Sequence, residues 1–99
     1  MIIYEVTAKV GEHLSSEYER FMIEQHVPDV LATGAFKSAS LDMTSDGLYR
    51  VCYIAEDREA LESYLNEHST ELRKAFSSRF SDGVEVVRKE WETIRTWKC

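Results

Sequence analysis

Stretches with a two-residue apolar repeat alternate with stretches that have a helical repeat, and their order restricts the fold more than any other feature. Residues 2–10 alternate apolar and polar side chains, as a strand with one buried face does. Three later stretches are rich in β-branched and aromatic residues, whereas two others place apolar residues on one helical face. The pattern predicts strands at 2–10, 35–43, 48–55 and 84–97, and helices at 16–27 and 58–76.

Residues that favour turns and helix ends separate these segments. Asp46 and Gly47 predict a tight hairpin between the second and third strands. Pro28 is expected to end the first helix and to begin a short separate turn, which Gly34 closes. Asp57 is expected to cap the second helix. Each predicted element therefore has a recognisable boundary.

The order strand, helix, strand, strand, helix, strand predicts an α+β domain of the ferredoxin-like βαββαβ type. Ninety-nine residues suffice for one domain, which we expect to span residues 1–99. Its four strands are expected to form one antiparallel sheet, with both helices on the same face.

The other face of this predicted sheet is also apolar. A sheet that is covered on one side only is normally polar on the other side, but the third strand has apolar residues on both faces. The last strand is longer than its neighbours and ends on large apolar side chains. We therefore expect a second copy of the chain to pack sheet against sheet, which makes the protein a homodimer. This expectation rests on Leu48, Cys52, Ile54, Trp91, Ile94 and Trp97.

Charge and cysteine content exclude several classes of partner. The 18 acidic residues outnumber the 12 basic ones, so that binding to nucleic acid or to an anionic membrane surface is not expected. No segment is long and apolar enough to cross a membrane, and the first residues lack the pattern of a secretory signal. Cys52 and Cys99 do not indicate a disulfide, and we expect the protein in the reducing cytoplasm.

Three segments resemble a bacterial family of uncharacterised small proteins within the dimeric α/β-barrel superfamily. They are MIIYEV at 1–6, HVPDVLATGAF at 26–36 and LESYLNEH at 61–68. The resemblance implies two ferredoxin-like protomers whose sheets face each other, with a pocket between sheet and helices in each protomer. The superfamily includes cofactor-free monooxygenases of polycyclic phenols, haem-degrading enzymes, isomerases and stress-response proteins, so the resemblance implies a fold and not a reaction.

Two histidines are the candidate catalytic residues. A continuous helix over 58–76 places His68 on the apolar stripe that faces the sheet, where an imidazole needs hydrogen-bond partners or a cavity. His26 lies just before Pro28, at a helix end where backbone groups are left free. Either one is also compatible with a purely structural role, as a satisfied core histidine or as a helix-terminal cation.

Polar and aromatic side chains near these histidines are the candidate ligand-binding residues. A tyrosine hydroxyl could orient a ligand, although at strand and helix spacing such rings are equally typical of a core. The candidates are Tyr4, Gln25, Tyr49, Tyr53 and Tyr64. The histidines and cysteines show no metal-ligand spacing, and no motif for a nucleotide or other cofactor is present, so neither a metal nor a cofactor is expected.

Three functions remain open from the sequence. The first is binding of a small apolar or aromatic ligand between sheet and helices. The second is a cofactor-independent monooxygenase or isomerase in which His26 or His68 acts as general base. The third is a non-catalytic structural or protein-interaction module. The sequence does not choose between an enzyme and a binding protein.

Overall fold

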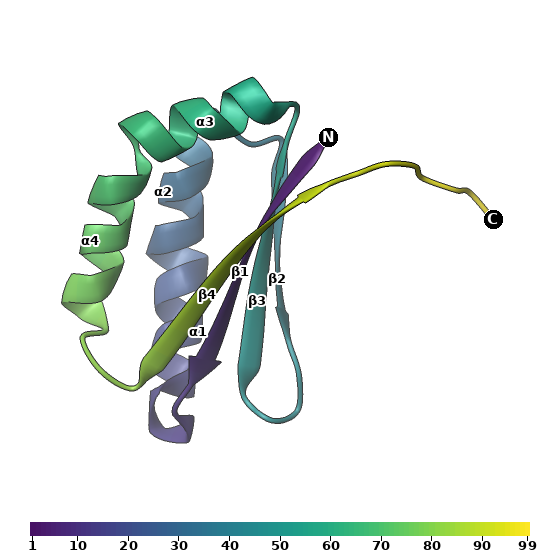
Figure 1. Cartoon of the computed structure of the whole chain (residues 1–99). Helices are drawn as coiled ribbons and strands as arrows, with labels where there is room; N and C mark the ends of the chain where they lie inside the picture. The colour runs from purple at the N-terminus through teal and green to yellow at the C-terminus, as the bar shows by residue number, and fades with distance from the viewer.

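The sheet has four antiparallel strands, and the helices all cover one of its two faces (Figure 1). The computed structural model describes all 99 residues. The strands lie in the order β2-β3-β1-β4, so that β1 and β3 form the centre. Their bounds are Ile2–Val10 (β1), Ser38–Met43 (β2), Leu48–Ala55 (β3) and Val84–Glu92 (β4). This arrangement confirms the predicted ferredoxin-like α+β fold.

Two helical segments cover the sheet, and each one is interrupted once. The first comprises a 3-10 turn η1 (Glu12–Leu14), α1 (Ser15–Phe21), a π-helical turn η2 (Met22–His26) and α2 (Val27–Ala32). The second comprises α3 (Arg58–Glu67) and α4 (Ser69–Arg79). None of the helices is both long and apolar enough to cross a membrane.

The helix end that the sequence predicts at Pro28 is wrong. The chain stays helical through Ala32, and Pro28 lies in the first turn of α2, where a missing N–H is tolerated. Just before it, the N–H of Val27 bonds to the carbonyl of Met22, five residues earlier, which is π-helical spacing. The wider turn accommodates the crowding that a proline ring causes at the carbonyl four residues before it. Pro28 therefore changes the local helix type instead of ending the helix.

The second helical segment bends at His68, where the sequence predicts one continuous helix. His68 has φ −125° and both ends α3 and begins α4. Figure 1 shows that these two helices meet at a large angle. A single helical wheel does not hold across such a bend, because the axis changes direction there. The predicted stripe accordingly fails at Ala75, which is exposed.

The predicted boundary residues at the other turns are confirmed. The side chain of Asp57 caps α3 by accepting a hydrogen bond of 2.9 Å from the N–H of Ala60. Gly47 in the hairpin between β2 and β3 has φ 81°, and Gly34 after α2 has φ 80°. Other residues rarely adopt these left-handed conformations.

The core lies between the sheet and the helices and is rich in aromatic rings. Residues 35–37, predicted as the start of a strand, precede β2, and Phe36 packs into the core. Its ring lies 4.9 Å from that of Tyr64 and 5.1 Å from that of Tyr53. The most completely buried large side chains are Tyr18, Tyr49, Leu61, Val30 and Val51.

The second face of the sheet is not covered by any part of the chain. On this face, Val87 and Trp91 of β4 are 56% and 50% exposed, and Leu48 of β3 is 39% exposed. Polar and charged residues lie between them, including Arg50, which pairs with Asp42 at 3.2 Å. The face is therefore mixed, and on β4 the apolar Val87 and Trp91 alternate with the charged Glu85 and Lys89.

The predicted continuation of the last strand to residue 97 is wrong. β4 ends at Glu92, because this residue already pairs with Ile2, the first residue of β1. The N–H of Thr93 still bonds to the carbonyl of Met1 at 3.0 Å, and residues 94–99 extend away from the body of the domain (Figure 1). Ile94 is 99% exposed and Trp97 is 75% exposed in this tail.

Candidate functional site

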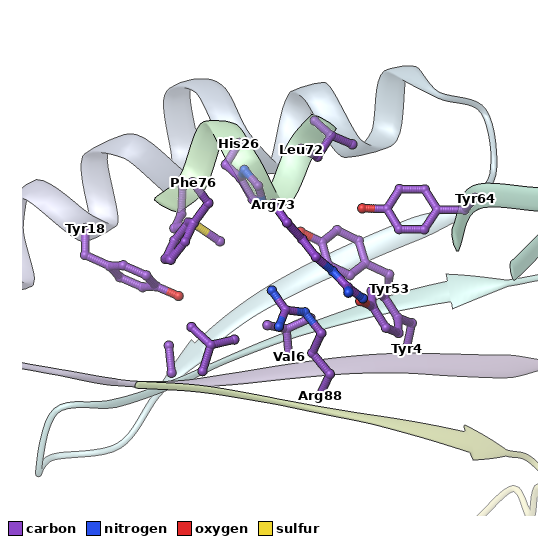
Figure 2. Close-up of a pocket in the computed structure, with 13 residues that line it drawn as sticks. Tyr4, Val6, Tyr18, His26, Tyr53, Tyr64, Leu72, Arg73, Phe76 and Arg88 are labelled. Carbon is purple, nitrogen blue, oxygen red and sulfur yellow. The ribbon is translucent and has the colours of Figure 1, made fainter. Parts of the chain in front are cut away.

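A narrow cavity lies between the sheet and the helices (Figure 2). Side chains from β1, β3 and β4 form one wall, and side chains from α1, η2, α3 and α4 form the other. The space measures about 470 Å³ with its open mouth, but its interior has room for only about two waters. A larger ligand therefore requires side chains at the mouth to move. The apolar lining comprises Val6, Ala8, Met22, Leu72, Phe76 and Val86.

Four tyrosines give the cavity its polar character. Tyr4 and Tyr53 come from neighbouring strands, pair directly across β1 and β3, and have ring centroids 6.1 Å apart. Tyr64 from α3 has its ring 6.0 Å from that of Tyr4. Tyr18 from α1 lies toward the other end of the cavity in Figure 2. Rings therefore line the space from both the sheet and the helices.

The hydroxyl groups of three of these tyrosines are free to bind a ligand. The hydroxyl of Tyr4 accepts a hydrogen bond of 3.0 Å from Arg73. Those of Tyr18, Tyr53 and Tyr64 have no hydrogen-bond partner in the protein, and none of them is sealed from solvent. Burial raises the pKa of Tyr64 to about 12, and it raises the pKa of Tyr18 and of Tyr53 as well. All three remain protonated at neutral pH and can donate a hydrogen bond.

His26 reaches the cavity from the π-helical turn η2. Its half-buried ring stacks on Phe21 at 5.7 Å and meets the edge of Phe76 at 5.6 Å. Burial lowers the pKa of His26, Asp29 opposes this shift, and the charge of Arg88 adds to it. The imidazole is therefore neutral at pH 7, which is the form that accepts a proton.

The pKa of His26 can be tested directly by NMR. We expect a value below the ordinary one of about 6.5, because burial disfavours the imidazolium. Arg88→Gln should raise this pKa, whereas Asp29→Asn should lower it further, since the two charges act in opposite directions. Because the folded-state pKa lies below the unfolded one, His26 contributes stability that is lost as the pH falls from about 6.5 through the folded-state value. A pKa at or above the ordinary value would contradict this account.

Two arginines also line the cavity, and the sequence did not single them out. Arg73 comes from α4 and Arg88 from β4, and Figure 2 shows both guanidinium groups among the tyrosines. Arg88 could have been found from the strand repeat, because Val84 and Val86 face the helices and the alternation places Arg88 on the same face. Arg73 carries no such signal, because the bend at His68 breaks the helical repeat.

The cavity includes four of the predicted candidates and leaves out the other three. His26, Tyr4, Tyr53 and Tyr64 line it. His68 does not: it lies half-buried at the corner between α3 and α4, with its ring 6.4 Å from that of Tyr64.

The remaining two candidates lie outside the cavity for different reasons. Gln25 is exposed, because the π turn directs His26 toward the core and Gln25 toward solvent. Tyr49 is buried, but its hydroxyl donates a hydrogen bond to Glu19 at 2.5 Å. No group of three or more His, Cys, Asp or Glu side chains is suitably placed to hold a metal ion.

Comparison with known proteins agrees with this fold. The sequence matches the family described as domain of unknown function (DUF4286) over residues 1–94. No protein of curated function gives a significant sequence match.

Several solved structures share the fold at low sequence identity. A candidate antibiotic biosynthesis monooxygenase from Deinococcus radiodurans has a TM-score of 0.73 at 12% identity, over 100% of this chain and 98% of that one. The monooxygenase ActVA-Orf6 of Streptomyces coelicolor, in complex with nanaomycin D, has a TM-score of 0.64 at 20% identity. The match covers 98% of this chain and 92% of that one. A Nitrosomonas europaea protein of unknown function has a TM-score of 0.65 at 11% identity, and the match covers 99% of this chain and 95% of that one.

Proposed function

This chain belongs to the DUF4286 family, whose function is unknown, and we propose from its geometry that the cavity binds a small aromatic ligand between sheet and helices. The observation that carries the proposal is the set of three tyrosine hydroxyls that face the cavity without a protein partner. A polar group in an apolar setting is normally satisfied by protein, water or ligand. The flat rings around them offer stacking and edge contacts to an aromatic molecule.

Entry of a ring requires the mouth to widen. Arg73 and Arg88 are both exposed residues with long, flexible side chains, and both also line the cavity. Rotating these side chains opens space without moving the backbone. A ring can therefore enter this narrow cavity once these two side chains rotate.

The proposal is tested by titrating 2-naphthol into the protein and following backbone and tyrosine NMR signals. Residues that line the cavity are expected to shift. Tyr53→Phe should weaken binding roughly 3- to 10-fold, because it removes one hydrogen bond and keeps the ring. Tyr49→Phe is the matched control, since this hydroxyl lies outside the cavity, and it should leave the affinity unchanged. The proposal would be overturned if 2-naphthol shifted no NMR signal of a cavity residue.

A second candidate function is cofactor-independent oxygenation or isomerisation with His26 as general base. A neutral imidazole at the cavity, beside tyrosines that can hydrogen-bond an oxyanion, is the observation that favours it. His26 would take a proton from an acidic phenol, and the resulting anion would react with dioxygen as co-substrate. Structural neighbours described as monooxygenases, one with nanaomycin D bound, support this candidate.

Oxygen uptake decides whether the chain catalyses such a reaction. With an acidic polycyclic phenol as substrate, uptake should exceed the rate without protein, and His26→Gln should lower the excess about 100-fold or more. His68→Gln is the control, because His68 lies outside the cavity. Absence of protein-dependent uptake would contradict the oxygenation.

The protein is also proposed to act as a homodimer in the bacterial cytoplasm. Large apolar side chains on the uncovered sheet face and in the tail support the dimer, since a second copy would remove them from water. Both cysteines are free thiols, which fits a reducing compartment.

A further inference from the structure

Arg73 and Arg88 differ from most other arginines of the chain. Arg20, Arg50, Arg58 and Arg79 each form an ion pair with a carboxylate. Neither Arg73 nor Arg88 forms one, although acidic residues outnumber basic ones 18 to 12. Two cations without a counter-charge thus face the same cavity.

Stacking on aromatic rings does not account for these two side chains. The guanidinium and ammonium groups that lie over rings belong to Arg79, Lys89 and Arg95. The contact that the chain provides is one hydrogen bond of 3.0 Å from Arg73 to the hydroxyl of Tyr4. Because a guanidinium has five N–H donors, most of the donors of this pair remain free for a ligand.

The charges of both arginines also act on the groups of the cavity. Arg88 lowers the pKa of His26, and Arg73 and Arg88 both oppose the rise in the pKa of Tyr64. Both charges therefore interact electrostatically with the polar lining of the cavity. Figure 2 shows both guanidinium groups directed into the cavity, that of Arg73 toward Tyr4 and Tyr53 and that of Arg88 toward the middle of the cavity.

We propose that the aromatic ligand of this cavity carries a carboxylate, which binds between Arg73 and Arg88 while its ring packs among the tyrosines. The inference rests on the proposed ligand-binding function and adds the charge of the ligand. A carboxylate presents two acceptor oxygens in one plane, which match the parallel N–H donors of guanidinium. Because Tyr4 accepts from Arg73, its own O–H is left to donate to the same anion.

The cavity also favours one small anion over a larger polyanion. Its lining is mainly apolar and its interior holds about two waters, so it could not hydrate several charges. One carboxylate between two arginines lowers the repulsion between them and leaves the ring in the apolar part.

Two probes of equal size separate charge from shape. 2-Naphthoate and 2-naphthamide carry the same ring, and only the first is an anion. We expect the wild-type protein to bind 2-naphthoate roughly tenfold or more tightly than 2-naphthamide, because charge-assisted hydrogen bonds are the stronger ones. Both titrations are followed by NMR at cavity residues.

Substitution of the arginines should remove the preference for the anion. Arg73→Gln and Arg88→Gln are each expected to weaken 2-naphthoate binding about 5- to 10-fold and to change 2-naphthamide binding less than about twofold. Arg73→Lys and Arg88→Lys retain the charge and should recover part of the loss. Arg20→Gln is the matched control, since Arg20 is exposed and pairs only with Glu24 on the helical surface. Circular dichroism and melting curves confirm that each variant is folded.

The possible outcomes distinguish this inference from the function on which it rests. If the signals of cavity residues give equal affinities for the two probes, the proposed preference for a carboxylate is wrong, and the cavity remains a site for a neutral aromatic ligand. A preference for 2-naphthoate that survives both glutamine substitutions would place the anion elsewhere and would also overturn the inference. If neither probe shifts the NMR signal of any cavity residue, the proposed ligand site itself is wrong.

Discussion

Replacing Leu61 by alanine is expected to lower the free energy of unfolding by about 2–5 kcal/mol, because it removes a fully buried side chain and leaves a cavity. Leu61 lies in α3 with 0% of its surface exposed and belongs to the core cluster. The turn of α3 that carries it is fixed by the Asp57 cap at one end and by buried Tyr64 on the other side. The core therefore has little freedom to close around the missing atoms.

Chemical denaturation at fixed protein concentration measures this loss, because association with a second copy would also change the apparent stability. Leu65→Ala is the matched control on the same helix. Leu65 is only partly buried, so the expected loss is smaller, about 1–2 kcal/mol. Equal losses at the two positions would mean that α3 is rotated about its axis relative to the structure.

The elements that the sequence predicted correctly are those with local signals. Apolar alternation defined β1, a run of β-branched and aromatic residues defined β3, and Asp46 and Gly47 defined the hairpin that joins β2 to β3. Asp57 marked the start of α3 because its side chain satisfies a backbone N–H that the helix itself leaves free. Such signals depend on a few neighbouring residues, so they can be read without knowledge of the tertiary structure.

The errors occur where packing between distant segments decides the outcome. Pro28 was expected to end a helix, but the helix continues because a π turn accommodates the ring. The last strand was predicted to residue 97, but it stops at Glu92, where its pairing with β1 ends at Ile2. Neither result is encoded in the repeat of the segment itself.

The candidate site was partly predictable for the same reason. Tyr4 and Tyr53 followed from the strand alternation, which holds in the structure, and His26 followed from the break expected near Pro28. The prediction for His68 failed because it assumed a straight helix across the bend. Arg88 was not singled out, although its register in β4 places it on the same sheet face as Val86, and its side chain lines the cavity.

Placing a charge on the uncovered sheet face is expected to dissociate the proposed homodimer. Trp91→Glu should weaken self-association by roughly 100-fold or more, because an unpaired buried charge costs several kcal/mol and the two-fold symmetry introduces it twice. Trp91 lies on the outer side of β4 and is 50% exposed in the single chain. Wild-type protein should sediment at micromolar concentration with twice the mass of the 11.5 kDa chain, and the variant with that of one chain.

The control for this experiment is Ile23→Glu. Ile23 is 62% exposed, but it lies on the helical side of the domain, away from the uncovered sheet face. The Ile23→Glu variant introduces the same charge in place of an exposed apolar side chain. Because the substitution lies away from the proposed interface, it should leave the sedimenting mass unchanged. Dissociation by both variants would show that the added charge and not the sheet face is responsible.

Deletion of residues 93–99 tests the contribution of the tail separately. The tail carries Ile94 and Trp97, which are 99% and 75% exposed in the single chain, and it extends away from its own domain (Figure 1). If the partner subunit covers these side chains, the truncated protein should associate more weakly while the domain stays folded, because β4 already ends at Glu92. A wild-type protein that sediments as a single chain, with tryptophan fluorescence typical of side chains in water, would contradict the dimer. The apolar side chains on the uncovered sheet face would then be ones that the single chain tolerates.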